Sequence, residues 1–289
     1  MKVLCVITLL CAAGYAVAKD PLTVPNCGKS FITAAPDRIV GGTTAPHGMY
    51  PWMVSLYERD GFWYHACGAT ILNDHWVVTA AHCIDFPNYP SSYKIYAGLH
   101  KQSDKYHDAV EVYDISDVFI HEHYDKRTNS NDIALLRTRD KINIAGSKGY
   151  INGICLPQDN SDPTGKGQIC GWGHEWSSGR NSDVLKHATI PLVDRRTCNN
   201  AYDSNPYDDR DVILENMICG GSENLDTCQN DSGGPLSQRD SKGISTLVGI
   251  TSFGRGCGMK GYPGVYTKVA YFRSWMTKTI QSRDPQYRS

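Results

Sequence analysis

A serine in the last third of the chain lies in a segment whose residue types could support nucleophilic chemistry. Ser232 belongs to the run NDSGGP at 230–235, and Asp226 precedes it by six residues. A serine hydroxyl is a weak nucleophile at its ordinary pKa, so it needs a general base and an acid that orients the base. His82 could be that base, and Asp132, at the start of an apolar run, could be the acid.

Elements far apart in the sequence must bring these residues together, and the pattern predicts an all-β protein. Short runs of β-branched and aromatic residues alternate with Gly, Pro and Asn, which is typical of strands joined by turns. This pattern is compatible with two β-barrels or with one large sandwich. The expected strands are 76–79, 94–97, 118–120, 133–136, 185–193, 235–237, 247–253 and 264–269.

One helix is expected near the C-terminus. Phe272, Met276 and Ile280 recur at the spacing of one buried helix face. In contrast, the segment 199–211 is rich in Asp, Asn and Pro, and we expect a surface loop there.

The N-terminus has the features of a secretory leader. Lys2 supplies a positive start, residues 3–13 are mostly apolar, and Ala16-Val17-Ala18 is a small-residue cleavage pattern. The apolar stretch is shorter than the ~20 residues that span a bilayer. We therefore predict a signal peptide at 1–18, a secreted, extracellular protein, and no membrane association.

Charge and motif spacing exclude several other classes. The formal net charge is -1, which does not indicate nucleic acid or an anionic membrane as a partner. No C-x-x-C pair recurs with metal-ligand spacing, and His121-Glu122-His123 lacks H-E-x-x-H spacing. We therefore expect no metal and no cofactor.

The cysteines indicate an oxidising compartment. Two of the eleven, Cys5 and Cys11, lie in the expected leader, so nine remain. An odd number cannot all pair internally, and spacing alone does not assign the pairs.

The chain resembles the chymotrypsin-fold serine proteases, and among them the trypsin-like branch. The motifs of His82, Asp132 and Ser232 occur in the family's chain order, and matching blocks are RIVGG at 38–42, GWG at 171–173 and PGVY at 263–266. The resemblance covers about residues 27–280. It implies two six-stranded antiparallel β-barrels packed together, approximately 39–150 and 151–289, with a C-terminal α-helix.

The resemblance also implies catalytic roles. Ser232 would attack the scissile carbonyl, His82 would take its proton, and Asp132 would orient His82. The backbone amides of Asn230 and Ser232 would form the oxyanion hole, although the family has glycine where Asn230 stands. Asparagine is among the residues that best tolerate positive φ. Two functions stay open: a serine endopeptidase, or a catalytically attenuated protease-like binding or regulatory protein.

By the same resemblance, Asp226 would lie at the base of the primary pocket. Gly254 and Gly264 would be its walls, and Ser252 and Phe253 would pair with the substrate backbone. A carboxylate in a narrow cleft selects basic side chains. The expected partners are protein or peptide substrates with Arg or Lys before the scissile bond, together with protein protease inhibitors, and the enzyme is expected to be a monomer.

Residues 19–38 would be an activation peptide, exposed and extended, ahead of the protease domain at 39–289. Cleavage after Arg38 would create an α-amino group on Ile39 that pairs with Asp231. The resemblance further implies four disulfides and leaves Cys170 as a buried apolar filler. The implied pairs are Cys27 with Cys155, Cys67 with Cys83, Cys198 with Cys219, and Cys228 with Cys257.

Overall fold

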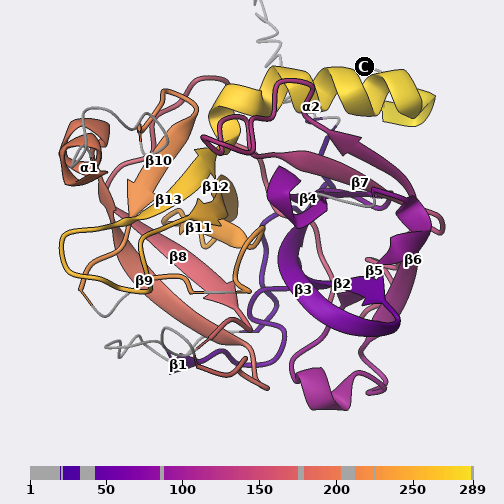
Figure 1. Cartoon of the computed structure of the whole chain (residues 1–289). Coiled ribbons are helices and arrows are strands. Elements are labelled where there is room, and N and C mark those ends of the chain that lie inside the picture. Colours follow the sequence, from indigo (N-terminus) through magenta and orange to yellow (C-terminus); the bar gives the residue numbers. More distant parts are fainter. Residues whose placement is uncertain are drawn as a thin grey trace, which may run out of the picture.

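A computed structural model of the chain shows two β-barrels side by side, with a long helix along one side of them (Figure 1). It describes residues 20, 22–32, 43–84, 88–174, 179–202, 212–223, 226–228 and 230–287. Within these ranges no helix combines the length and the hydropathy needed to cross a bilayer.

The first barrel is closed and contains six antiparallel strands in the order β2-β3-β4-β7-β6-β5. Its wall follows the strand period of two: in β5, with sequence YKIYA, alternate residues are buried and half-buried. The strands are β2 (Met53–Asp60), β3 (Phe62–Ile71), β4 (Trp76–Thr79), β5 (Tyr93–Ala97), β6 (Glu111–Ile120) and β7 (Ala134–Thr138).

The second barrel closes through the pairing of β8 with β9, in the order β9-β10-β13-β12-β11-β8, and β1 (Thr43–Thr44) adds to β9. Two six-stranded antiparallel barrels with a C-terminal helix confirm the predicted fold. The strands are β8 (Lys166–Gly171), β9 (Lys186–Val193), β10 (Met217–Gly220), β11 (Pro235–Arg239), β12 (Ser245–Phe253) and β13 (Gly264–Lys268).

The predicted C-terminal helix is α2 (Val269–Arg283), and Phe272, Met276 and Ile280 are its buried face. The expected loop at 199–211 is wrong at its start, because α1 (Arg195–Tyr202) extends through those residues; 203–211 lie outside the described residues. Cys198 and Tyr202 are the buried face of α1, so packing outweighs the weak helix propensity of its Asn and Thr residues. Short 3-10 helices are η1 (Ala81–Ile84), η2 (Pro90–Ser92), η3 (Gln102–Asp104) and η5 (Pro285–Tyr287).

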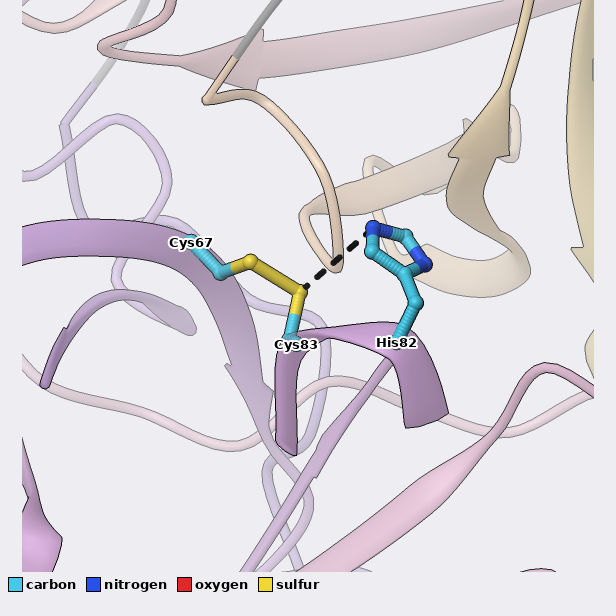
Figure 2. A group of neighbouring side chains, drawn as sticks. All are labelled: Cys67, His82 and Cys83. Carbon is cyan, nitrogen blue, oxygen red and sulfur yellow. Dashed lines mark hydrogen bonds between the residues drawn. A yellow bond between two sulfur atoms is a disulfide. The ribbon is translucent and has the colours of Figure 1, made fainter. Parts of the chain in front are cut away.

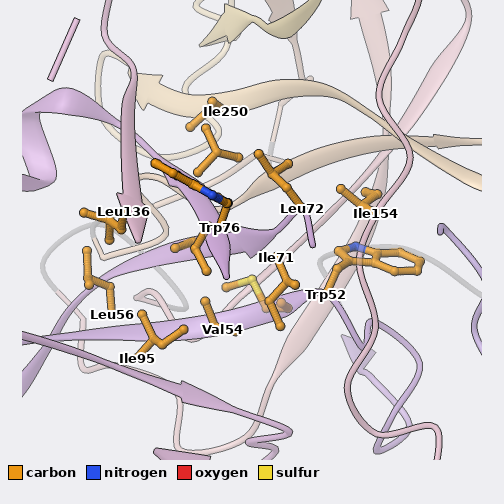
Figure 3. Close-up of a cluster of buried hydrophobic side chains, with 14 of the residues drawn as sticks. Trp52, Val54, Leu56, Ile71, Leu72, Trp76, Ile95, Leu136, Ile154 and Ile250 are labelled. Atoms are coloured by element: carbon orange, nitrogen blue, oxygen red, sulfur yellow. The ribbon is translucent and has the colours of Figure 1, made fainter. Parts of the chain in front are cut away.

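The largest hydrophobic cluster crosses from one barrel to the other. Figure 3 shows Trp76 and Leu136 of the first barrel packed near Ile250 of β12. The buried face of α2 belongs to the same cluster. The two barrels therefore share a core, which fixes their relative position and that of the loops between them.

Four disulfides join the same pairs that the resemblance implies, and Cys170 is unpaired and buried. The 27–155 bridge ties the N-terminal segment to the body of the protein. The other three lie next to the site described below or brace α1 against β10.

The N-terminal segment is anchored to the barrels, so the expectation of an exposed, extended peptide is wrong for its described part. Leu22 is only 1% exposed, and its carbonyl accepts a hydrogen bond from Asn73 Nδ2 at 3.0 Å. Asp20 Oδ2 pairs with Arg273 of α2 at 2.5 Å. Gly28 N–H donates to the Gly153 carbonyl at 2.8 Å. The segment has few apolar residues, but one of them, Leu22, is buried in the main hydrophobic cluster.

We expect Leu22→Ala to lower the stability of the whole protein. Truncation of a fully buried leucine typically costs about 2–5 kcal/mol, which lowers the melting temperature of a chain of this size by several degrees. Urea and thermal denaturation measure the loss. Phe31→Ala is the matched control, since Phe31 belongs to the same segment but is 60% exposed. Equal effects of the two variants would show that Leu22 is no anchor.

Candidate active site

The carboxylate of Asp132 and the imidazole of His82 form a tightly bonded pair. His82 follows β4 on η1, and Asp132 lies just before β7, the strand that pairs with β4. His82 Nδ1 donates to Asp132 Oδ2 at 2.7 Å, and the His82 backbone N–H donates to Oδ1 at 2.9 Å. A proton on Nδ1 leaves the lone pair of a neutral imidazole on Nε2, the nitrogen that points away from Asp132.

Residues of the second barrel complete the surroundings of Asp132. Ser252, at the end of β12, donates its hydroxyl to Asp132 Oδ2 at 2.6 Å. Thr267 of β13 donates its hydroxyl to the Asp132 carbonyl at 2.7 Å. Asp132 is fully buried, and its carboxylate accepts three hydrogen bonds, as a buried charge requires. The pair therefore lies where the two barrels meet.

The loop that carries Ser232 comes from the second barrel, just before β11, and packs onto the first. The Gly68 N–H of β3 donates to the Ser232 carbonyl at 2.8 Å. Gly233 of this loop packs closely against the first barrel. An added Cβ on Gly233 would be 3.1 Å from the sulfur of Cys83, the neighbour of His82. Among the described residues, no hydrogen bond joins Ser232 Oγ to His82. Bonds of this kind commonly tighten only when substrate binds.

A disulfide lies beside the imidazole. Figure 2 shows His82 Nε2 directed at Cys83 Sγ, 3.8 Å away, with Cys67 on the far side of the sulfur bridge. Ligand atoms of these three residues lie within 4.8 Å of one another. Because both sulfurs belong to the disulfide, neither is a thiolate that could bind a metal ion. The bridge instead ties η1 to β3.

Asn230 has a positive φ of 69°, the backbone conformation that glycine adopts most easily. Its carbonyl accepts a hydrogen bond from His65 Nε2 at 3.2 Å, and its side-chain amide donates to Asn181 Oδ1 at 2.7 Å. Among the described residues, neither the Asn230 nor the Ser232 backbone N–H donates to a protein acceptor. Two amide donors two residues apart thus remain open to a ligand.

The carboxyl of Asp226 lies directly against Gly264, and Gly254 lies beside that glycine. An added Cβ on Gly264 would be 2.4 Å from Asp226 Oδ1, and one on Gly254 would be 3.8 Å from the Cα of Gly264. A side chain at position 264 would therefore collide with the Asp226 carboxyl. Phe253, which precedes Gly254 at the end of β12, contacts the ring of Tyr202, with ring centroids 6.1 Å apart.

Burial raises the pKa of Asp226 to about 6. Hydrogen bonds from Thr227 N–H, Gly258 N–H and the Tyr266 hydroxyl, at 2.8, 3.4 and 3.5 Å, lower it only in part. An ionised carboxylate here is poorly satisfied by the protein alone. A cation beside this carboxylate would satisfy it.

Asp231, next to Ser232, is held by the 171–173 turn. Gly173 N–H donates to its Oδ1 at 2.8 Å, and Cys228 N–H donates to Oδ2 at 3.0 Å. Burial nevertheless raises the pKa of Asp231 to about 6. The residues expected to be cleaved and paired with it, Arg38 and Ile39, lie outside the described residues.

Four contacts of the site were not expected from the sequence. Ser252 was expected to meet substrate, and its hydroxyl also holds Asp132; Thr267 supports Asp132; His65 and Asn181 hold Asn230. Each joins residues more than 45 positions apart, and no local pattern marks such pairs.

Comparisons with known proteins agree with this geometry. The profile of the family described as Trypsin matches residues 39–276. The chain is 42% identical over 245 residues to U21-ctenitoxin-Pn1a of Phoneutria nigriventer, and 40% identical over 245 residues to the venom peptide isomerase heavy chain of Agelenopsis aperta; each match covers 84% of this chain and 100% of the relative. It is 38% identical over 247 residues to Trypsin-1 of Astacus astacus, covering 82% of this chain and 98% of that protein. A family profile that spans most of the chain, and three relatives matched over nearly their whole length, show that the chain belongs to the trypsin family of serine proteases, with the chymotrypsin fold.

Proposed function

We propose that the protein is the zymogen of a secreted serine endopeptidase that hydrolyses peptide bonds after Arg or Lys. Residues 1–18 are its signal peptide, 19–38 its activation peptide and 39–289 its protease domain. The observation that carries the proposal is the Asp226 carboxyl, which lies against Gly264 and whose pKa is raised by burial to about 6. A basic side chain that reached this carboxyl would compensate the cost of burying its charge, so the site would favour Arg and Lys over uncharged side chains.

The catalytic step follows from the Asp132–His82 pair. His82 Nε2 takes the proton of Ser232 Oγ as that oxygen attacks the scissile carbonyl, and it then gives the proton to the leaving amine. Asp132 keeps the imidazole in the tautomer that its 2.7 Å hydrogen bond to Nδ1 defines. Water then hydrolyses the acyl-enzyme by the same proton transfers in reverse order.

The negative charge of the tetrahedral intermediate needs donors that are already in place. The backbone N–H groups of Asn230 and Ser232 are suitable, since neither donates to a protein acceptor within the described residues. Each such donor is worth about 10²–10³ in turnover. Ser252 and Phe253 lie at the end of β12, where the substrate backbone would pair with the edge of the sheet.

Activation would place a cation beside Asp231. Cleavage after Arg38 frees the α-amino group of Ile39, which would pair with the Asp231 carboxylate and stabilise the loop of Ser232. The raised pKa of Asp231 supports this, because a buried carboxylate with two amide donors still gains from an ammonium partner.

Two further observations support secretion. Four disulfides are typical of an oxidising compartment, and two relatives carry names that mark them as a toxin and a venom protein. We propose that the enzyme acts as a monomer on protein or peptide substrates, is subject to protein protease inhibitors, and uses no cofactor, metal, nucleic acid or membrane.

One observation favours a second candidate function. The Asn230 side chain lies in the oxyanion loop, where the family pattern has glycine, and this could reduce turnover enough for the protein to act as a protease-like binding or regulatory protein. Labelling of Ser232 by a fluorophosphonate, after cleavage at Arg38, separates the two candidates because only a working triad reacts.

The experiment that tests the proposed function is a peptide-library digest with the activated protein, read by mass spectrometry. New termini after Arg or Lys are the expected result. A product of unchanged mass and altered retention would instead indicate a peptide isomerase, as the name of one relative would suggest. No product of either kind, together with no labelling of Ser232, would favour the binding protein.

We expect Asp226→Ser to lower kcat/KM for an Arg amide by about 3–5 kcal/mol in ΔΔG‡, because the substrate cation would lose its buried partner. Steady-state kinetics on Arg, Lys, Phe and Ala amides measure the change. Glu223→Gln is the matched control, since Glu223 is an exposed acid three residues earlier that pairs with Lys260. A preference for Phe or Ala in the parent enzyme would contradict the pocket assignment.

We expect Arg38→Gln protein to stay inactive, and the parent to gain activity with the new N-terminus Ile-Val-Gly-Gly. A free α-amino group has a pKa of about 8, and pairing with Asp231 raises it. The stabilisation is fully present below the free value and is lost as the pH climbs through the raised one, so activity should fade at alkaline pH. Full activity of uncleaved Arg38→Gln protein would refute the activation step.

Asp226→Asn should stabilise the protein near neutral pH. The pKa of Asp226 is raised from 3.8 to about 6, so the folded state holds its proton more tightly than the unfolded state. The parent is therefore penalised increasingly as the pH rises from about 4 to about 6, and the asparagine variant is not. Melting temperatures of both in a Ser232→Ala background, at pH 4 and pH 7.5, should differ only at the higher pH. An equal difference at both would show that ionisation is not the cause.

A further inference from the structure

The side chain of Asn230 is held in place by a residue of a different loop. Its Nδ2 donates to Asn181 Oδ1 at 2.7 Å, across 49 positions of sequence. Asn230 is half-buried, whereas Asn181 is exposed. The bond therefore runs from the oxyanion loop to the surface loop that follows the 171–173 turn.

The backbone at Asn181 is held by nearby hydrogen bonds. Asn181 forms a bridge with His174, and the next residue, Ser182, donates its backbone N–H to the carbonyls of Trp172 and Gly173 at 3.1 and 3.2 Å. The Ser182 hydroxyl donates to the Val184 carbonyl at 2.7 Å. These bonds restrain the backbone from which the Asn181 side chain reaches Asn230.

A second hydrogen bond, from His65, holds the carbonyl of Asn230. Burial lowers the pKa of His65 to about 4, so its ring is neutral at neutral pH. Because Nε2 donates to the Asn230 carbonyl at 3.2 Å, Nδ1 must be the acceptor, and it receives the hydroxyl of Ser55 at 2.6 Å. Ser55 is fully buried in β2. The first barrel thus holds the carbonyl of Asn230.

Two of the groups on the Asn230 Cα are therefore held by hydrogen bonds, the carbonyl by His65 and the side chain by Asn181. With these two groups held, the position of the third, the amide nitrogen, is restrained as well, and the residue has a φ of 69°. A positive φ is unfavourable for any residue with a Cβ, and least so for asparagine. The hydrogen bond from the side chain to Asn181, which forms in this conformation, helps to offset that cost.

We propose that Asn181 is a positioning residue for the oxyanion hole: its hydrogen bond to the Asn230 side chain holds the Asn230 amide toward the reacting carbonyl. This rests on the proposed function. Asn181 need not touch substrate. Its effect appears only where Asn230 is present, because a glycine has no side chain to hold and reaches positive φ without steric cost.

A double-mutant cycle in the activated enzyme tests this, with Asn181→Ala, Asn230→Gly and the double variant. A small Arg amide is the substrate, and kcat and KM are determined separately. We expect Asn181→Ala to lower kcat about 10-fold, or about 1.4 kcal/mol, with KM changed less than 2-fold, since the oxyanion forms only in the transition state. In the Asn230→Gly background the same change should have no effect.

Arg180→Ala is the matched control, because Arg180 is the exposed neighbour of Asn181 in the same loop and should leave kcat unchanged. Equal effects of Asn181→Ala in both backgrounds, or no effect in the natural one, would overturn the proposal. If every variant lacks turnover, the proposed function fails, and the backbone amide resonance of Asn230 decides the inference instead. A shift of that resonance in Asn181→Ala but not in Arg180→Ala supports the proposal, and an unmoved resonance refutes it.

Discussion

The buried carboxylate of Asp132 is the interaction on which the site depends. A charge without solvent must be satisfied by the protein, and here three hydrogen bonds do so, two from His82 and one from Ser252. His82 belongs to the first barrel, and Ser252 belongs to the second. The hydrogen bonds that stabilise the buried charge therefore also orient the imidazole and connect the two barrels. The geometry of the site thus depends on how the barrels pack.

Two other carboxyls remain incompletely satisfied, and both lie within six residues of Ser232. Burial raises the pKa of Asp226 and of Asp231 to about 6, although each accepts backbone hydrogen bonds. An added Cβ on Gly173 would lie 2.4 Å from the Asp231 carboxyl, so the 171–173 turn lies directly against it. In the proposed function each carboxyl pairs with a cation: the substrate side chain for Asp226, and the Ile39 ammonium for Asp231. The cost of ionising each buried carboxyl is then offset when its cation binds.

The sequence predicted what local patterns or a family resemblance encode. The spacing of Phe272, Met276 and Ile280 was sufficient for α2, and the resemblance implied the two barrels, where strand patterns alone also allowed a sandwich. Several features escaped prediction, among them that Leu22 is an anchor, that α1 extends into the expected loop, and that Asn181 contacts Asn230. Each depends on a partner distant in sequence. A lone leucine in a proline-rich segment, or an asparagine in a loop, has the same local pattern whether or not that partner exists.

Asn230 shows why a departure from a family pattern must be interpreted with its contacts. Considered alone, a side chain in place of glycine brings a steric cost and a less favourable φ, and both point to weaker catalysis. In the structure, however, His65 bonds the Asn230 carbonyl and Asn181 bonds its side chain, so the side chain gives a second attachment to the backbone segment of the proposed oxyanion hole. Glycine reaches this conformation easily but also leaves it easily. In our proposal, asparagine at this position therefore makes the oxyanion hole depend on Asn181, and the effect of the substitution on turnover follows from that contact.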